Sequence, residues 1–292
     1  YEDKLAKFGN DNRKGIVGDN YLDITDNKYG NNVLLTADAA VGTMQAGVIA
    51  GGRNNGIGID GIANADIMTL RVEGMDGDPY LKDMALAIRY AVDHNADIIV
   101  LPAQNTLYPE VQRGWISEAL LYAESKGVLV IVPAQENSVD LAEYTFYPNR
   151  WMAGKKELTN LMVVSSSDKN GNPSMNSNYG DKEVDLYAPG IDIYTTYTGD
   201  TYQTGKGVGL AAATAAGVAA LIKSYYPHLN GGQIRELLLK NVTSRVDVEV
   251  EKGIRLQNGQ QSQDLFLFGD LCLSGGILNA YQAVVAAGEL KN

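Results

Sequence analysis

The chain has 292 residues, 45% of them hydrophobic, with a formal net charge of −11 and a sequence pI near 4.7. This length and apolar content predict one large domain. Nucleic acid is excluded as a partner, because phosphate binding needs clustered Lys and Arg rather than an excess of Asp and Glu. Cys272 is the only cysteine, so neither an internal disulfide nor a cysteine-based zinc site is expected. No window approaches about eighteen uninterrupted apolar residues, which predicts no membrane span, and the polar segment after Tyr1 is unlike a targeting signal.

Residues 1–32 are rich in Asp, Asn and Gly and show no sustained hydrophobic period. We therefore expect a polar N-terminal surface arm with turns, followed by one domain over residues 33–292. Within the arm, the side chains of Asp19, Asp23 and Asp26 offer oxygen ligands for calcium. Their spacing fits no regular calcium loop, which favours a solvated loop, with a structural calcium ion as the competing interpretation.

Apolar residues at helical spacing alternate with short β-branched runs along most of the chain. This alternation predicts βαβ units and an α/β fold with a mostly parallel sheet covered on both faces. Residues 168–173 predict a turn rather than a calcium loop, because no bidentate Glu follows them. Residues 246–267 predict an irregular or β excursion. The expected helices are 43–52, 82–93, 111–125, 231–241 and 277–289, and the expected strands are 66–72, 98–101, 128–132, 161–165 and 184–187.

The stretch TGKGVGLAAATAAGVAALIKSYYP, residues 204–227, predicts a helix through the middle of the core. Small and apolar residues occupy every face of it, which a solvent-exposed amphipathic helix would not tolerate. Pro227 ends this helix, because proline cannot continue the hydrogen-bond ladder. A glycine-rich turn before a buried helix also directs free N–H groups at one point. The N-terminus is therefore either a tight packing turn or a place for chemistry.

Three phrases resemble the motifs of one family, the subtilisin-like serine peptidases (subtilases, peptidase S8). VGTMQAGVIAGGRNNGIGIDGIANADIMTLRV (residues 41–72) resembles their histidine motif. GVGLAAATAAGVAAL (residues 207–221) resembles their serine motif, and NYGDKEVDLYAPG (residues 178–190) resembles the segment that precedes it. The similarity runs from about Val33 to Gly288 and is strongest to bacterial members. It implies a three-layer α/β/α fold and an extracytoplasmic location.

By this resemblance, the positions of the family's catalytic groups carry other residues here. Val41 stands at the position of the catalytic histidine, Gly209 at that of the nucleophilic serine, and Glu136 at that of the oxyanion asparagine. The motif neighbours differ as well, since Met44 replaces a second histidine and Ala213 replaces a proline.

In the family, the catalytic aspartate lies at the end of an apolar strand upstream of the histidine motif. No such strand precedes Val41, and Asp11 is rejected because Lys-Phe-Gly-Asn comes before it instead of a β-branched run. We therefore expect the sheet to lack this strand within the chain. The open slot is expected to be filled by a segment upstream of Tyr1 or by a separate chain, with the arm of residues 1–32 as the least favoured source.

An argument independent of the resemblance points the same way. A serine, histidine and aspartate mechanism needs an imidazole to take and return a proton, and the chain has only two histidines. His94 follows a predicted surface helix and His228 follows the end of the core helix, so both are interpreted as ordinary surface residues.

The former substrate cleft is altered too, because the family's substrate-pairing strand corresponds here to proline, which has no N–H. The cleft positions are Pro102, Ala103, Gln104 and Gln135.

The sequence thus predicts a subtilisin-like protein without peptide hydrolysis, a pseudopeptidase, with a peptide or protein held in the former cleft. The alternative is a serine endopeptidase whose catalytic residues were mutated or lie partly outside this chain. At the emptied site, we expect the carboxylate of Glu136 to turn inward and cap the free N–H groups around Gly209, rather than to turn to solvent and leave an anion pocket.

Overall fold

A six-stranded sheet runs through the middle of the molecule. In the computed structural model, which describes residues 15, 17–36, 39–72, 81–102, 109–151 and 157–290, its strands lie in the order β1-β2-β3-β4-β10-β7. All neighbours are parallel except β10 and β7, which are antiparallel. The strands are β1 (Ile98–Val100), β2 (Leu129–Pro133), β3 (Leu161–Ser167), β4 (Leu186–Pro189), β10 (Gly276–Leu278) and β7 (Val242–Ser244).

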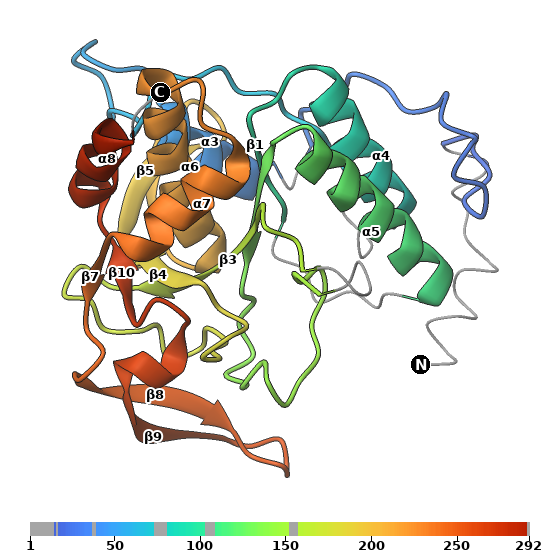
Figure 1. Ribbon diagram of the computed structural model, residues 1–292. Coiled ribbons are helices and arrows are strands. Elements are labelled where there is room, and N and C mark those ends of the chain that lie inside the picture. Colours follow the sequence, from blue (N-terminus) through green and yellow to red (C-terminus); the bar gives the residue numbers. More distant parts are fainter. Residues whose placement is uncertain are drawn as a thin grey trace.

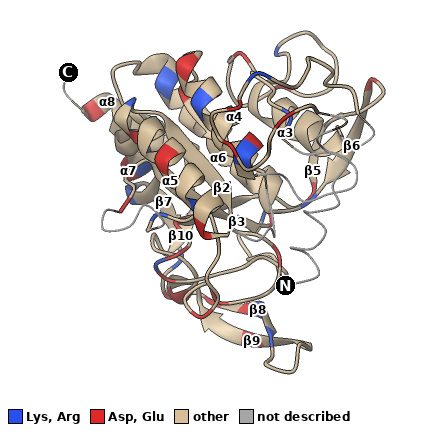
Figure 2. Ribbon diagram, turned by 90° about the vertical axis from the view of Figure 1, so that its right-hand side faces the viewer, with Lys and Arg blue, Asp and Glu red and all other residues tan. Residues whose placement is uncertain are grey.

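Helices cover both faces of this sheet (Figure 1). Alternate side chains of the central strands enter opposite cores: Val130 and Val163 pack in the cluster of one face, and Ile131 and Met162 in the cluster of the other. The predicted three-layer α/β/α fold is therefore confirmed. One face carries a pair of helices, along both of which Figure 2 marks charged residues. That pair is α4 (Leu81–Asp93) and α5 (Glu110–Ser125), and the other face carries α6 (Val208–Tyr225), α7 (Gly231–Lys240) and α8 (Ala280–Glu289).

Helix α6 is the core helix that the sequence predicted. It packs against β1, β2, β3 and β4 and against α3 (Ala40–Ala50), α7 and α8. Its alanines allow this close approach on all sides, and it ends at Tyr225, just before Pro227. By length and composition alone α6 is apolar enough to cross a membrane, but 61% of that stretch is buried inside this fold.

Helix α3 lies beside the beginning of α6 and contacts a hairpin formed by β5 (Ile193–Tyr197) and β6 (Thr201–Gly205). A Cβ at Gly47 would overlap the hydroxyl groups of Thr195 and Thr196, so only glycine permits this contact. The two hydroxyls donate to backbone carbonyls of α3, those of Met44 and Thr43. The helix was predicted from the sequence, and the hairpin was not.

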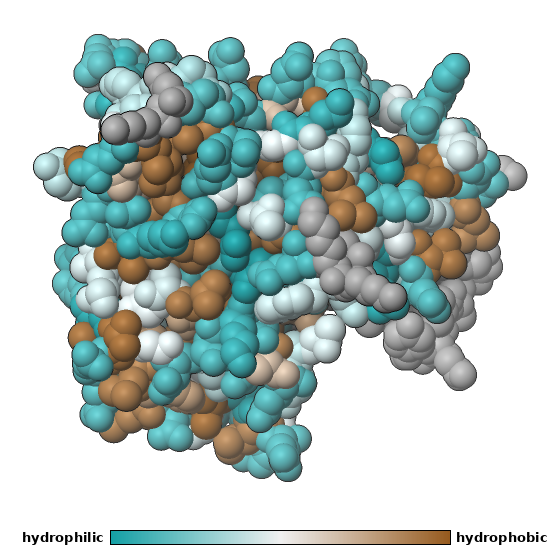
Figure 3. Space-filling model, in the orientation of Figure 1, coloured by the Kyte–Doolittle hydropathy of each residue, from teal (hydrophilic) through white to brown (hydrophobic). Residues whose placement is uncertain are grey.

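A second hairpin, formed by β8 (Glu249–Arg255) and β9 (Gln261–Leu267), projects from the body of the molecule (Figure 1). It leads into a short 3-10 helix, η1 (Phe268–Leu271). The excursion predicted for residues 246–267 is therefore a regular antiparallel hairpin. Figure 3 shows apolar side chains gathered between polar ones on the lower part of the molecule, where this hairpin lies.

The predicted strand 66–72 is wrong. The described residues of this segment belong to no strand, and the side chains of Ile67 and Met68 are 44% and 43% exposed. Strand β1 has only β2 as a partner among the described residues, and all three of its residues are only partly buried. An apolar segment becomes a strand when a neighbour pairs with it. The described part of the chain offers residues 66–72 no such neighbour.

Residues 17–32 of the N-terminal arm belong to no helix or strand, as predicted. One of its residues departs from the surface arm that the sequence suggested: Asp19 is buried and pairs with the buried ammonium group of Lys82 in α4 at 2.8 Å. The Nζ atom of Lys82 also donates to the carbonyl of Asn20 at 2.7 Å. Polar atoms of the arm therefore fix it to the domain, which composition alone did not indicate.

Candidate functional site

The N-terminus of α6 is the centre of the candidate site. Gly207 precedes the helix with a φ of 135°, a conformation that favours glycine, and its N–H donates to the carbonyl of Gly190 at 2.7 Å. Gly209 lies in the first turn, where N–H groups have no partner within the helix. The sequence therefore places the residue that resembles the family's nucleophile position where the helix dipole favours negative charge.

The loop after β2 brings Glu136 to this end of α6. It follows the C-terminal end of β2, and Gln135 before it adopts a φ of 67°, so the chain turns towards α6. The carboxylate oxygen Oε1 of Glu136 accepts a hydrogen bond from the backbone N–H of Val208 at 3.2 Å. The predicted cap is present, with Val208 rather than Gly209 as the donor. Glu136 is nevertheless an exposed residue, so the cap lies at the surface and not inside a closed site.

Helix α3 supplies the second wall of the site. Val41 is 62% exposed and offers only an alkyl group. One turn further along the helix, Gln45 donates from Nε2 to the backbone carbonyl of Gly209 at 2.9 Å. The methyl group of Met44 lies against Gly205, at a place where a Cβ on that glycine would overlap it. The amide of Gln45 therefore lies beside Gly209, and the thioether of Met44 lies beside Gly205.

Sequence reasoning missed Gln45. The available signal was its spacing of four residues from Val41, which puts both side chains on one face of a helix. Of the predicted cleft residues, Pro102 is partly buried at the end of the β1 segment, while Ala103 and Gln104 lie outside the described residues. Gln135 accepts at its carbonyl from the N–H of Asn178 at 3.0 Å, which fixes the loop that carries Glu136.

Both histidines lie away from this site. His94 stacks on Tyr90, with ring centroids 3.8 Å apart, and its Nδ1 atom lies 2.8 Å from the carbonyl of Tyr90. His228 follows the other end of α6, and a rise of about 1.5 Å per residue puts Tyr225 at that end about 24 Å from Gly209. Neither imidazole can exchange a proton with a group at the N-terminus of α6.

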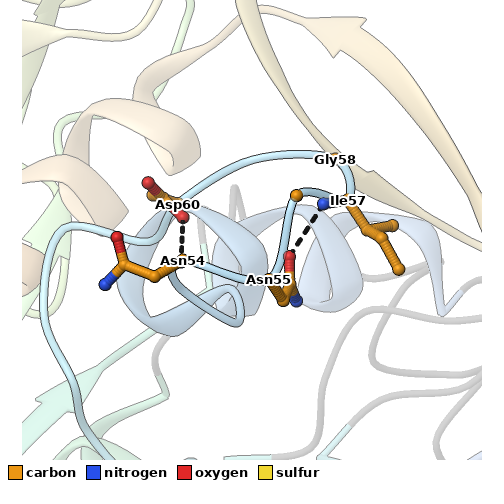
Figure 4. A pocket seen from close by; sticks show the side chains of 6 residues that line it. Asn54, Asn55, Ile57, Gly58 and Asp60 are labelled. Atoms are coloured by element: carbon orange, nitrogen blue, oxygen red, sulfur yellow. Dashed lines mark hydrogen bonds between the residues drawn. The ribbon is translucent and has the colours of Figure 1, made fainter.

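A pocket of about 470 Å³ opens in the loop that follows α3 (Figure 4). Its side chains hold the loop itself: the Oδ1 atom of Asp60 accepts from the N–H of Asn54, and the Oδ1 atom of Asn55 accepts from the N–H of Ile57, both at 2.9 Å. Asp60 is the only carboxylate that lines the pocket. No cluster of three or more His, Cys, Asp or Glu suited to a metal ion occurs in the part of the chain that the structure describes.

The carboxylates considered for calcium have partners within the protein. Asp19 pairs with Lys82, and Oδ1 of Asp23 accepts from the N–H of Thr25 at 2.9 Å. Oδ2 of Asp26 accepts from the N–H of Asn20 at 2.6 Å. Asp168 closes the predicted turn, because its Oδ1 atom accepts from the N–H groups at positions 170 and 172 at 2.8 Å each. Asp19 therefore holds an ion pair with α4, and the other three carboxylates stabilise turns.

Known proteins are similar to this chain in sequence and fold. The model of the subtilase family, Peptidase_S8, matches residues 17–269. Subtilisin BL of Lederbergia lenta is 32% identical over 204 residues, covering 70% of this chain and 70% of that protein. A thermostable alkaline protease of Halalkalibacterium halodurans is 32% identical over 203 residues, covering 69% of this chain and 52% of the relative, so the chain spans about half the length of that relative. Among solved structures, a protease of Pseudoalteromonas arctica PAMC 21717 superimposes with a TM-score of 0.63 at 26% identity, covering 85% of this chain and 70% of that one.

Proposed function

Because the chain belongs to the subtilase family, peptidase S8, we propose that it is a pseudopeptidase, which keeps the subtilisin-like fold without triad-based hydrolysis. One observation carries this proposal: Gly209 stands at the N-terminus of α6, at the motif position of the nucleophile, and the chain's two imidazoles lie elsewhere. Its location outside the cytoplasm is part of the same proposal and rests on the family.

The magnitude of the expected loss is large. In subtilisin, removal of the serine or the histidine alone lowers turnover by about 2 × 10⁶, which corresponds to roughly 8.6 kcal/mol of barrier. Here the matching positions hold Gly209 and Val41, neither of which can attack a carbonyl or carry a proton. The rate that remains is near background.

The oxyanion site is altered as well. A peptide hydrolase stabilises the developing negative charge with hydrogen-bond donors. Glu136 stands at the motif position of one donor, and an ionised carboxylate accepts but cannot donate. It also accepts the N–H of Val208, so a donor at the helix end is already in use. A negative charge at this place disfavours a second one, which argues against both catalysis and an anionic ligand.

We therefore propose that the former cleft holds a peptide or protein without cleaving it. By its motif position Pro102 belongs to this cleft, and because proline has no N–H, a regular β ladder cannot hold the ligand there. The ligand contacts must come from side chains and from the other wall. Pull-down with the purified chain, followed by identification of bound peptides, tests this binding role.

An active-site-directed phosphonate tests the loss of chemistry. We expect no covalent labelling of the chain and no cleavage of a peptide library above background. The variant Val41→His with Gly209→Ser should remain inactive, because Glu136 still replaces the oxyanion donor. Labelling of the unmodified chain, or cleavage by the double variant at the rate of an active subtilase, would contradict the proposal and favour a peptidase whose machinery lies partly outside this chain.

We also propose that a strand from outside the described residues pairs with the open edge of β1. The parallel register joins Ile98, Ile99 and Val100 to β2, and alternate residues of such a strand direct their N–H and C=O groups to the other edge. Unpaired buried groups of this kind cost about 1–3 kcal/mol each. A segment upstream of Tyr1 or a separate chain is the favoured source.

Hydrogen exchange tests the open edge. In the 292-residue chain the amides of Ile98 and Val100 should exchange faster than those of Ile131 and Val163 in the sheet centre. Addition of the missing segment should slow only the first two. Equal protection of all four amides in the chain alone would show that the open edge of β1 is already paired.

A further inference from the structure

The space beside the first turn of α6 is open among the described residues. Gly207 and Gly209 are both partly exposed. A Cβ on Gly207 would have carboxylate atoms of Glu136 as its nearest neighbours, at 3.5–3.8 Å. Outside its own helix, a Cβ on Gly209 would have only Nε2 of Gln45 within 4 Å, at 3.3 Å. A ligand group can therefore enter this space, which we call the helix-end niche, and meet Glu136 and Gln45 there.

The carboxylate of Glu136 has no ion-pair partner in the part of the chain that the structure describes. Its Oε1 atom accepts the N–H of Val208 at 3.2 Å. Lys206, the basic residue just before Gly207, has an exposed side chain and forms no ion pair with this carboxylate. The Oε2 atom of Glu136 therefore keeps its capacity to accept hydrogen bonds from a ligand.

The charges at the helix-end niche do not cancel. The carboxylate of Glu136 contributes one full negative charge, whereas the N-terminus of α6 contributes a positive charge of about half that size. The side chains of Val41 and Gln45 contribute none. The net charge of the whole chain, −11, acts in the same direction as the carboxylate. The niche therefore attracts a cation and repels a second anion.

The hydrogen-bonding groups of the niche agree with its charge. The Nε2 atom of Gln45 donates to the carbonyl of Gly209 at 2.9 Å, and its Oε1 atom accepts from no described residue. Each of the two lining side chains thus has one oxygen that is still able to accept. An ammonium or guanidinium group carries several N–H donors and no acceptor, so it matches such a lining. Hydrogen bonds between a cation and a carboxylate are roughly twice as strong as neutral ones.

We infer that the helix-end niche binds a positively charged group of the peptide held in the former cleft. The group is an ammonium or guanidinium, supplied by a Lys or Arg side chain or by a free amino terminus. The Oε2 atom of Glu136 accepts from this cation, and the Oε1 atom of Gln45 is the second acceptor. This inference rests on the proposed function, because it names the chemistry by which the proposed ligand is recognised.

Alanine hexapeptides with blocked termini and one central Lys, Arg, Gln or Glu serve as probes. Binding is measured by NMR titration of the full chain, from the amide signals of Val208 and Gly209. The Lys and Arg peptides should bind about three- to fivefold more tightly than the Gln peptide, as for a partly exposed ion pair, and the Glu peptide should bind most weakly. A Gln peptide with a free amino terminus separates the two sources of the cation. If unblocking alone gives the same gain, the amino terminus is the recognised group.

Substitutions at position 136 test whether this carboxylate reads the charge. Glu136→Gln should reduce the preference for Lys over Gln to less than about 1.5-fold, and Glu136→Lys should reverse it in favour of the Glu peptide. The matched control, Asp181→Lys, makes the same change of charge at an exposed site elsewhere and should keep the preference. Salt at about 0.5 M should weaken the preference in the unmodified chain. Circular dichroism and thermal unfolding establish that each variant is folded.

The possible failures are distinguishable. Equal binding of charged and neutral peptides, or a preference for Lys that survives Glu136→Gln, would overturn this inference and leave the proposed binding role in place. Absence of binding by every peptide at millimolar concentration would overturn both. Cleavage of the bound peptides with the preference for Lys retained would contradict only the pseudopeptidase proposal.

Discussion

Strands β3 and β1 belong to one sheet and differ in their surroundings. β3 has a partner on each side and helices over both faces, and all seven of its residues are buried. β1 has one partner among the described residues, and its three residues are each only partly buried. Both strands begin with a short apolar run in the sequence, so the difference comes from their neighbours in the sheet. It teaches that the centre of the sheet is fully paired among the described residues, whereas β1 keeps one edge without a described partner, the edge at which we propose a further strand.

The largest effect is expected at a buried charge of the sheet centre. Asp185, next to β4, accepts from Arg150 at 2.7 Å, from Arg235 at 2.6 Å and from the N–H of Val163 at 2.6 Å. Asp185→Ala leaves the two guanidinium groups without their shared carboxylate and should lower the free energy of unfolding by about 3–5 kcal/mol in urea titration. Asp181→Ala, at an exposed position, is the control. A loss below about 1 kcal/mol would show that the network adds nothing to the stability of the centre.

A matched pair of truncations measures the contrast between centre and edge directly. Ile131→Ala removes fully buried atoms from β2 and should cost about 2–5 kcal/mol. Ile99→Ala in β1 should cost less than half as much, because its side chain is only partly buried. Addition of a segment that completes the sheet should increase the loss of unfolding free energy caused by Ile99→Ala and leave the loss caused by Ile131→Ala unchanged. Equal costs in the chain alone would contradict the comparison.

The hairpin adds a pH dependence of its own. Burial lowers the pKa of Lys252 to about 7, from an ordinary value of 10.5. Above pH 7 the folded state releases this proton while the unfolded state keeps it, so the unfolded state binds more protons and stability rises with pH. The slope reaches at most about 1.4 kcal/mol per pH unit. We therefore expect the free energy of unfolding to rise from pH 7 to 9. At higher pH the thiol of Cys272 opposes this trend, because burial raises its pKa to about 11.

Lys252→Met tests this dependence, because Met has a similar length and no charge. Its stability should be nearly flat between pH 7 and 9, while the exposed Lys206→Met should keep the rise. An unchanged slope in Lys252→Met would assign the pH dependence to another group.

The smallest effect is expected at the helix cap. Glu136→Gln keeps an oxygen that can accept from Val208 but removes the charge from the positive end of α6. It should cost about 0.3–1 kcal/mol at low ionic strength and less in high salt. Thermal unfolding of both proteins at two salt concentrations measures this difference. A stabilising effect of the substitution would show that the carboxylate repels its surroundings instead of capping the helix.

Much of the fold and part of the site followed from the sequence. Residues 204–227 predicted the core helix, because a run of alanine and apolar residues on every face has no stable place outside a core. The motifs around Val41 and Gly209 identified the elements that meet at the site, and Glu136 was expected at the end of α6, where it lies. These results depend on local pattern, on residue chemistry and on a family order of elements, all of which are present in the printed sequence.

Tertiary structure alone decided the rest. Residues 66–72 have the composition of a strand, but a strand needs a partner, and partners are not encoded in a local pattern. Gln45 reaches Gly209, and Asp19 reaches Lys82, across 164 and 63 residues of sequence. Lys252 looks like a surface lysine in a polar hairpin and is buried only because β8 lies against the loop at Met175. Burial and pairing depend on which segments meet, and that is determined when the whole chain packs.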